Sequence, residues 1–129
     1  MKGLKNILLK KLIIYSYIFL SIFTQPLLAA GVVRDQNRNQ QVNVEKAPNG
    51  VPIVNINAPN NNGVSHNYFK EYNVEKEGIL LNNSAKEFNR TQIGGIIQGN
   101  SNLNGREANV ILTEVTGVNR SKIEGYTEI

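Results

Sequence analysis

Apolar residues along most of the chain occur in short runs separated by turn-forming residues. Beyond residue 30 these runs are three to six residues long, and Asn- and Gly-rich turn signals recur about every dozen residues. Such spacing is typical of β-strands joined by tight turns. The pattern therefore predicts an all-β fold, with strands in the following order: 42–44, 51–57, 64–74, 79–81, 96–97 and 108–115.

The first of these turns has a sequence that favours a hairpin. Pro48, Asn49 and Gly50 are a turn signal of the hairpin kind, because Asn and Gly tolerate positive φ, and they precede the strand 51–57. In that strand, Val54 and Ile56 share one face. Residues 31–50 are otherwise polar and predict an exposed leader or an edge segment.

The stretch 67–77 is compatible with two elements. Tyr68 and Tyr72 are four residues apart and Gly78 follows, as in an amphipathic helix that ends at a glycine. As a strand, the stretch would place Val64, Tyr68, Tyr72 and Val74 on one face. We favour the strand because good helix formers such as Ala, Leu and Met are absent from the stretch.

The N-terminus has the organisation of a secretory signal peptide. Lysines come first, an apolar run from 12 to 23 follows, and small residues surround Ala30. A transmembrane anchor is the alternative, but polar residues interrupt the run and it is short for a span of about 20 residues. We therefore predict a helical signal peptide over 1–30, cleavage after Ala30, and no stable membrane insertion.

The charge of the chain comes from this N-terminal segment. Residues 31–129 hold ten basic and ten acidic side chains, so the formal net charge of +4 resides entirely in residues 1–30. A neutral exported segment offers no electrostatic reason to bind nucleic acid or an anionic membrane surface.

The residues of catalytic and metal sites are sparse. The chain has no cysteine and one histidine, His66, which disfavours a transition-metal site or a catalytic triad. Residues 94–99 lack the spacing and the lysine of a phosphate loop. The glutamates near 71–77 alternate with lysines, as on a solvated face. The sequence thus predicts no enzyme, catalytic residue, cofactor or metal.

Asparagine is the most prominent component of the exported segment. Residues 31–129 contain 19 asparagines. Asparagine amides can form ladders between equivalent positions of stacked β-coils, which would fit a solenoid. Codon preference in an AT-rich genome is an equally good explanation, and no strict repeat period is visible.

Three local sequences in order carry a family resemblance: residues 64–74 with 78–84, residues 93–103, and residues 108–126. Together they resemble the N-terminal secretion domain of filamentous haemagglutinins, haemolysins and contact-dependent growth-inhibition exoproteins. The resemblance covers about residues 51–129.

The resemblance implies both a fold and a route of export. The fold would be a right-handed parallel β-helix, incomplete here, with capping strands. The signal peptide would take the chain to the periplasm of a Gram-negative bacterium. There the periplasmic domains of an outer-membrane two-partner secretion transporter would recognise it, and the product would be secreted or held at the cell surface.

The resemblance also identifies a secretion motif, and this chain departs from it. The family's Asn-Pro-Asn-Leu appears here as Asn100, Ser101, Asn102 and Leu103, which would serve in transporter recognition or as a turn. Serine does not fix φ as proline does, so a looser turn is expected. The family's second motif would follow soon after Tyr126, so we expect 31–129 to be the N-terminal part of the domain, truncated at its C-terminal end.

Three function classes follow from these observations. The first is a secretion-targeting domain of an adhesin or toxin-delivery exoprotein. The second is a self-contained adhesive β module that binds a host or neighbouring-cell surface. The third, an exported polysaccharide hydrolase, is disfavoured because the carboxylates form no recognisable cluster.

Overall fold

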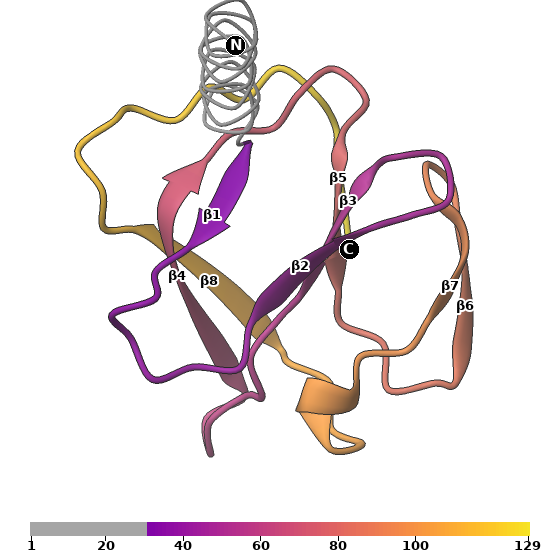
Figure 1. Cartoon of the computed structure of the whole chain (residues 1–129). Coiled ribbons are helices and arrows are strands. Elements are labelled where there is room, and N and C mark those ends of the chain that lie inside the picture. The colour runs from indigo at the N-terminus through magenta and orange to yellow at the C-terminus, as the bar shows by residue number, and fades with distance from the viewer. Residues whose placement is uncertain (1–30) are drawn as a thin grey trace, which may run out of the picture. The chain divides into compact units, whose positions relative to one another are not determined.

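β-Strands are the main secondary structure of residues 31–129, the part of the chain that the computed structural model describes (Figure 1). The signal peptide predicted for 1–30 and its helix lie outside the described residues. Within 31–129, no helix has the length and apolar character needed to span a membrane. The elements are β1 (Val32–Arg34), β2 (Asn43–Lys46), β3 (Pro52–Asn55), β4 (Val64–Tyr72), β5 (Ile79–Asn82), β6 (Phe88–Thr91), β7 (Gly95–Gln98), the 3-10 helix η1 (Ser101–Leu103), β8 (Val110–Val115) and β9 (Thr127–Glu128).

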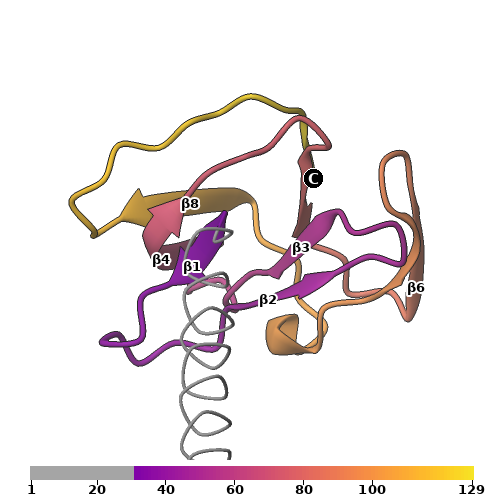
Figure 2. The same ribbon diagram turned by 45° about the horizontal axis from the view of Figure 1, so that its top comes forward.

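The strands form three sheets, with the orders β1-β4-β8, β2-β3-β5-β9 and β6-β7. Segments distant in sequence pair in parallel, namely β4 with β8, β3 with β5, and β5 with β9. The pairs β1–β4, β2–β3 and β6–β7 are antiparallel. Figures 1 and 2 both show β4 beside β8, and the hairpin β6–β7 apart from them on the other side of β3 and β5. The predicted all-β class is confirmed.

The central strands β3 and β5 are buried on both faces, because each face packs against a different cluster. One cluster lies towards β4, and its buried members are Val42, Val54, Ile56, Phe69, Val74, Ile79, Leu81 and Leu103. The other lies towards the hairpin, and its buried members are Ala47, Val51, Ile53, Leu80 and Ile97. Strands that are covered on both faces are continuous apolar runs, as residues 79–81 are. The predicted shared face of Val54 and Ile56 is confirmed.

The stretch 64–72 is the strand β4, which confirms the preferred alternative, and two of its three buried side chains are polar. The buried side chains of β4 are Ser65, Asn67 and Phe69, whereas Val64 and Tyr68 are half-buried on the opposite face. Polar groups can lie inside when their hydrogen bonds are satisfied. Ser65 Oγ donates to Asn57 O at 2.6 Å, and Asn67 Oδ1 accepts from Asn57 N at 2.8 Å. Hydrophobicity alone therefore does not identify the inward face of this strand.

The two hairpins have the turn residues that their backbones require. Between β2 and β3, Gly50 has φ +90°, and the main chain is closed by Gly50 N donating to Ala47 O at 2.9 Å. Between β6 and β7, Gly95 has φ +72°. Both glycines occupy the left-handed region, which side chains rarely adopt. The hairpin predicted at Asn49–Gly50 is confirmed.

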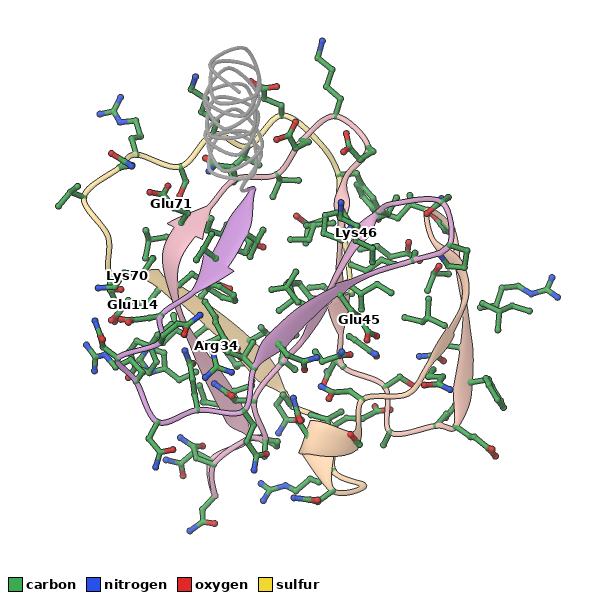
Figure 3. The ribbon with its side chains drawn as sticks, viewed as in Figure 1. Arg34, Glu45, Lys46, Lys70, Glu71 and Glu114 are labelled. Atoms are coloured by element: carbon green, nitrogen blue, oxygen red, sulfur yellow. The ribbon has the colours of Figure 1, made fainter. Side chains whose placement is uncertain are left out.

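The polar segment 31–50 supplies edge strands, as predicted, and it also supplies a buried carboxylate. Strands β1 and β2 lie at the edges of their sheets. Arg34 reaches from β1 towards β2, where its Nη1 donates to Val42 O at 3.2 Å (Figure 3). Asp35 follows β1, and its side chain is only 3% exposed. The prediction of an exposed segment is wrong at Asp35.

Asp35 links the first strand of the segment to the end of β8. Thr116 Oγ1 donates to Asp35 Oδ2 at 2.7 Å, and Asn37 N donates to Oδ1 at 3.0 Å. The hydrogen bond from Thr116 is the main cause that lowers the pKa of Asp35 below its ordinary value; burial opposes it. Lys70 Nζ and Arg38 Nε, each 3.8 Å from a carboxylate oxygen, lower the pKa further. The charged form of Asp35 is therefore the form that stabilises the fold.

We predict that Asp35→Asn destabilises the chain at pH 7 and that its effect fades in acid. A carboxyl whose folded-state pKa is lowered contributes stability above its unfolded pKa of about 3.9 and loses it as the pH falls through the folded value. The measurement is the urea unfolding midpoint of wild type and variant between pH 7 and pH 2.5. Glu45→Gln, at an exposed carboxylate of β2, is the control. An equal difference between wild type and Asp35→Asn at all pH values would contradict this role.

Candidate functional site

The predicted secretion motif forms a single tight turn between β7 and β8. Residues 101–103 are the 3-10 helix η1, and Asn100 caps its N-terminus because its Oδ1 accepts from Asn102 N at 3.0 Å. Asn104 ends η1 in the left-handed conformation with φ 52°. Leu103 N donates to Asn100 O at 3.2 Å, and Asn104 N donates to Ser101 O at 3.3 Å. The turn is closed without a proline.

Asn100 is buried and joins this turn to two strands. It is 4% exposed, and its Nδ2 donates to Ile56 O and to Asn82 O, both at 2.9 Å. Its own main-chain N–H donates to Ser84 O at 2.8 Å. One amide group thus satisfies carbonyls at the ends of β3 and β5 and an amide of η1. Aspartate has no N–H₂ group with which to make the same donations.

The same strand ends carry a two-member asparagine ladder. Asn55 and Asn82 are opposite each other in the parallel pair β3–β5, and Asn82 Nδ2 donates to Asn55 Oδ1 at 2.9 Å. Both side chains are buried. The asparagine ladder, one of the two explanations left open for the asparagine content, is thus present at this position, beside Asn100.

The remaining motif residues divide between the interior and the surface. Asn102 Nδ2 lies 3.2 Å from Gln41 O and from Asn55 O, so it ties η1 to the chain before β2 and to β3. Leu103 is 2% exposed and belongs to the larger apolar cluster. Of the four, only Ser101 is exposed, and Asn102 is half-buried. The four residues are therefore mainly a structural unit.

A shallow pocket lies beside the exposed side of the turn. It has a volume of about 320 Å³, and Phe88, Gln98 and Ser101 are among the residues that line it. Phe88 is 59% exposed on the hairpin β6–β7. The surface next to the motif is thus formed by the hairpin, whose first strand the apolar pattern did not predict.

The other residues weighed from the sequence as catalytic or phosphate-binding candidates have contacts typical of a structural role. His66 stacks on Tyr68 with ring centroids 4.1 Å apart, and its Nε2 is 3.5 Å from Glu114 Oε1. Figure 3 labels Glu114 at the end of β8 near Lys70 of β4. Residues 94–99 form the turn and strand of the hairpin. Within residues 31–129, no group of three or more His, Asp or Glu side chains is arranged to hold a metal ion.

We predict that Asn100→Ala lowers the free energy of unfolding by about 2 to 4 kcal/mol, because it removes three side-chain hydrogen bonds from a buried site. Ser101→Ala, one residue away and exposed, should change it by less than about 0.5 kcal/mol. Urea unfolding of both variants measures the two effects. Equal effects would show that the buried amide has no special role.

We predict that Ser101→Pro stabilises the turn by about 0.4 to 1 kcal/mol, since it restricts the unfolded chain. Position 101 is the first residue of η1, where proline is favoured, and its N–H donates to no other residue in the described segment. Asn100 has φ −89° and ψ 105°, which suits a residue before proline. The expectation that serine loosens the turn would be contradicted by an unchanged unfolding midpoint.

The chain is similar in sequence to part of a CdiA endonuclease and to part of a hemolysin. The chain is 52% identical over 107 residues to the 16S rRNA endonuclease CdiA of Enterobacter cloacae, covering 82% of this chain and 3% of that protein. It is 48% identical over 86 residues to a hemolysin of Serratia marcescens, covering 67% of this chain and 5% of that protein. The chain therefore spans a small part of the length of these curated relatives.

A solved structure agrees with these relatives. The crystal structure of a filamentous hemagglutinin secretion domain superimposes with a TM-score of 0.67 and 39% sequence identity, over 76% of this chain and 31% of that one. Residues 30–129 match the family model of the TPS (two-partner secretion) secretion domain. The sequence resemblance is thereby confirmed, and the chain belongs to the TPS secretion domain family.

Proposed function

We propose that residues 31–129 direct the secretion of a filamentous-haemagglutinin-like adhesin or toxin-delivery exoprotein by presenting a folded surface to an outer-membrane transporter. The observation that carries the proposal is the motif turn, in which Asn100 holds β3, β5 and η1 together. Membership of the TPS secretion domain family supports it.

The architecture that we propose is the beginning of a right-handed parallel β-helix. The parallel pairs β3–β5–β9 and β4–β8 support this arrangement, since each pairs segments from successive passes of the chain. The antiparallel strands β1 and β2 would cap its first coil. Residues 1–30 would act as a signal peptide that brings the chain to the periplasm of a Gram-negative bacterium.

In this proposal the motif residues have separate tasks. Asn100, Asn102 and Leu103 would stabilise the domain, because their polar groups or side chains are directed to the interior. Ser101 and the neighbouring pocket would form part of the surface that the periplasmic domains of the transporter contact. The transporter would then release the product outside the cell or to the cell surface.

The test is export of the 129-residue chain from Gram-negative cells with and without a co-expressed two-partner secretion transporter. We predict transporter-dependent appearance of the wild-type chain in the medium. Asn100→Ala should reduce this export, because it removes the buried hydrogen bonds that hold the motif turn and so lowers the share of chains that present the folded surface. Ser101→Ala is the matched control for a change in the same turn that leaves the buried bonds intact.

Export with and without the transporter distinguishes a secretion domain from a self-contained adhesive module. Export of the wild-type chain that does not depend on the transporter would contradict the proposal and favour a self-contained adhesive module. Transporter-dependent export that is unaffected by Asn100→Ala would retain the secretion role and reject the structural task of the motif. Immunoblots of cells, periplasm and medium measure each outcome.

A further inference from the structure

We propose that Asn104 is a site of spontaneous deamidation in the folded chain, at the end of the secretion motif. The reaction needs an asparagine whose following residue offers a free, unhindered main-chain nitrogen, and glycine is the least hindered follower. Three Asn-Gly pairs occur between residues 31 and 129: 49–50, 62–63 and 104–105. The three pairs differ in the hydrogen bonds made by the asparagine side chain and by the glycine nitrogen.

At the first pair, both reacting groups are held. Gly50 N donates to Ala47 O at 2.9 Å. Asn49 Nδ2 donates to Ile93 O at 2.7 Å, and its Oδ1 accepts from Val51 N at 3.2 Å. The side-chain carbon of Asn49 therefore cannot turn towards the next nitrogen without loss of these bonds.

At the second pair, the attacking nitrogen is held. Gly63 N donates to Asn60 O at 2.9 Å within the turn before β4. A hydrogen bond at this nitrogen retains its proton and fixes its direction. Reaction at Asn62 therefore requires prior opening of the turn.

At the third pair, neither group is held by the described segment. Gly105 N and the side chain of Asn104 form no hydrogen bond with any residue of 31–129. Both residues are exposed, and no atom lies within 4 Å of the position that a Gly105 Cβ would occupy. Asn104 N, by contrast, donates to Ser101 O at 3.3 Å, so the main-chain hydrogen bond of the pair lies on its Asn104 side.

The chemistry is hydrolysis of the side-chain amide through a cyclic imide. Gly105 N loses its proton to solvent and attacks Cγ of Asn104, and the side-chain nitrogen leaves as ammonia. Water then opens the imide at either carbonyl, which gives aspartate or isoaspartate at position 104. The net change is the gain of one water and the loss of one ammonia, with no oxidant or cofactor.

The product would alter the turn that follows Leu103. Arg106 N donates to Leu103 O at 3.1 Å across the Asn104–Gly105 pair. Isoaspartate inserts a methylene into the main chain between these two groups, and aspartate adds a negative charge directly after η1. The reaction therefore modifies the motif turn without involving the buried bonds of Asn100.

The test is ageing of the folded 129-residue chain at pH 8 and 37 °C, followed by peptide mass spectrometry at all three Asn-Gly pairs. We expect Asn104 to react about tenfold faster than Asn49 and Asn62, the factor that one retained hydrogen bond of net value near 1.4 kcal/mol would give. In concentrated urea the three rates should converge. Equal rates in the folded chain, or a slower rate at Asn104, would overturn the proposal.

A variant separates the modification from general ageing. Asn104→Gly removes the reacting amide and tolerates the left-handed backbone at this position. The unfolding midpoint of the wild-type chain should fall with age, while that of the variant should stay constant. If both midpoints fall equally, the damage arises elsewhere and the consequence assigned to Asn104 is refuted.

Discussion

The buried amide of Asn100 is the interaction on which the arrangement of the central strands depends. A main-chain carbonyl at the end of a buried strand must be hydrogen-bonded, and Asn100 Nδ2 supplies partners to Ile56 O and Asn82 O together. These carbonyls belong to segments of parallel strands, so the amide fixes how far each strand extends past the other. A slip of one residue would turn the apolar residues of β3 and β5 to the wrong clusters.

Hydrogen-bonded polar groups replace disulfides and a large core in stabilising this small segment. The segment has no cysteine, and several of its buried residues are polar, including Asp35, Ser65 and Asn67. Each has partners that are distant in sequence or across a strand, such as Thr116 for Asp35. A polar interior of this kind favours the observed arrangement of strands, because breaking these bonds would leave a buried polar group without a partner.

The sequence predicted those features of the fold that depend on neighbouring residues. The Asn49–Gly50 hairpin, the shared face of Val54 and Ile56 and the strand 64–72 each follow from a few adjacent positions. The inward face of β4 and the burial of Asp35 were not predictable in this way. Asp35 is buried because Thr116, 81 residues further on, donates to it. Ser65 and Asn67 are inside because the chain at Asn57 returns to meet them.

The geometry of the motif bears on how such a domain would be recognised. A family resemblance identified residues 100–103, but nothing in their spacing indicated that Asn100 would be buried or that Asn102 would reach the main chain of β3. A protein that meets the folded domain can contact Ser101, the half-buried Asn102 and the adjacent hairpin surface, whereas Asn100 and Leu103 are buried. A requirement for these residues in export would therefore reflect the stability of the turn, and direct recognition would depend on residues around it. The turn depends on the buried amide of Asn100 and the surface on exposed positions such as Ser101, so a serine at 101 in place of proline leaves the buried bonds intact.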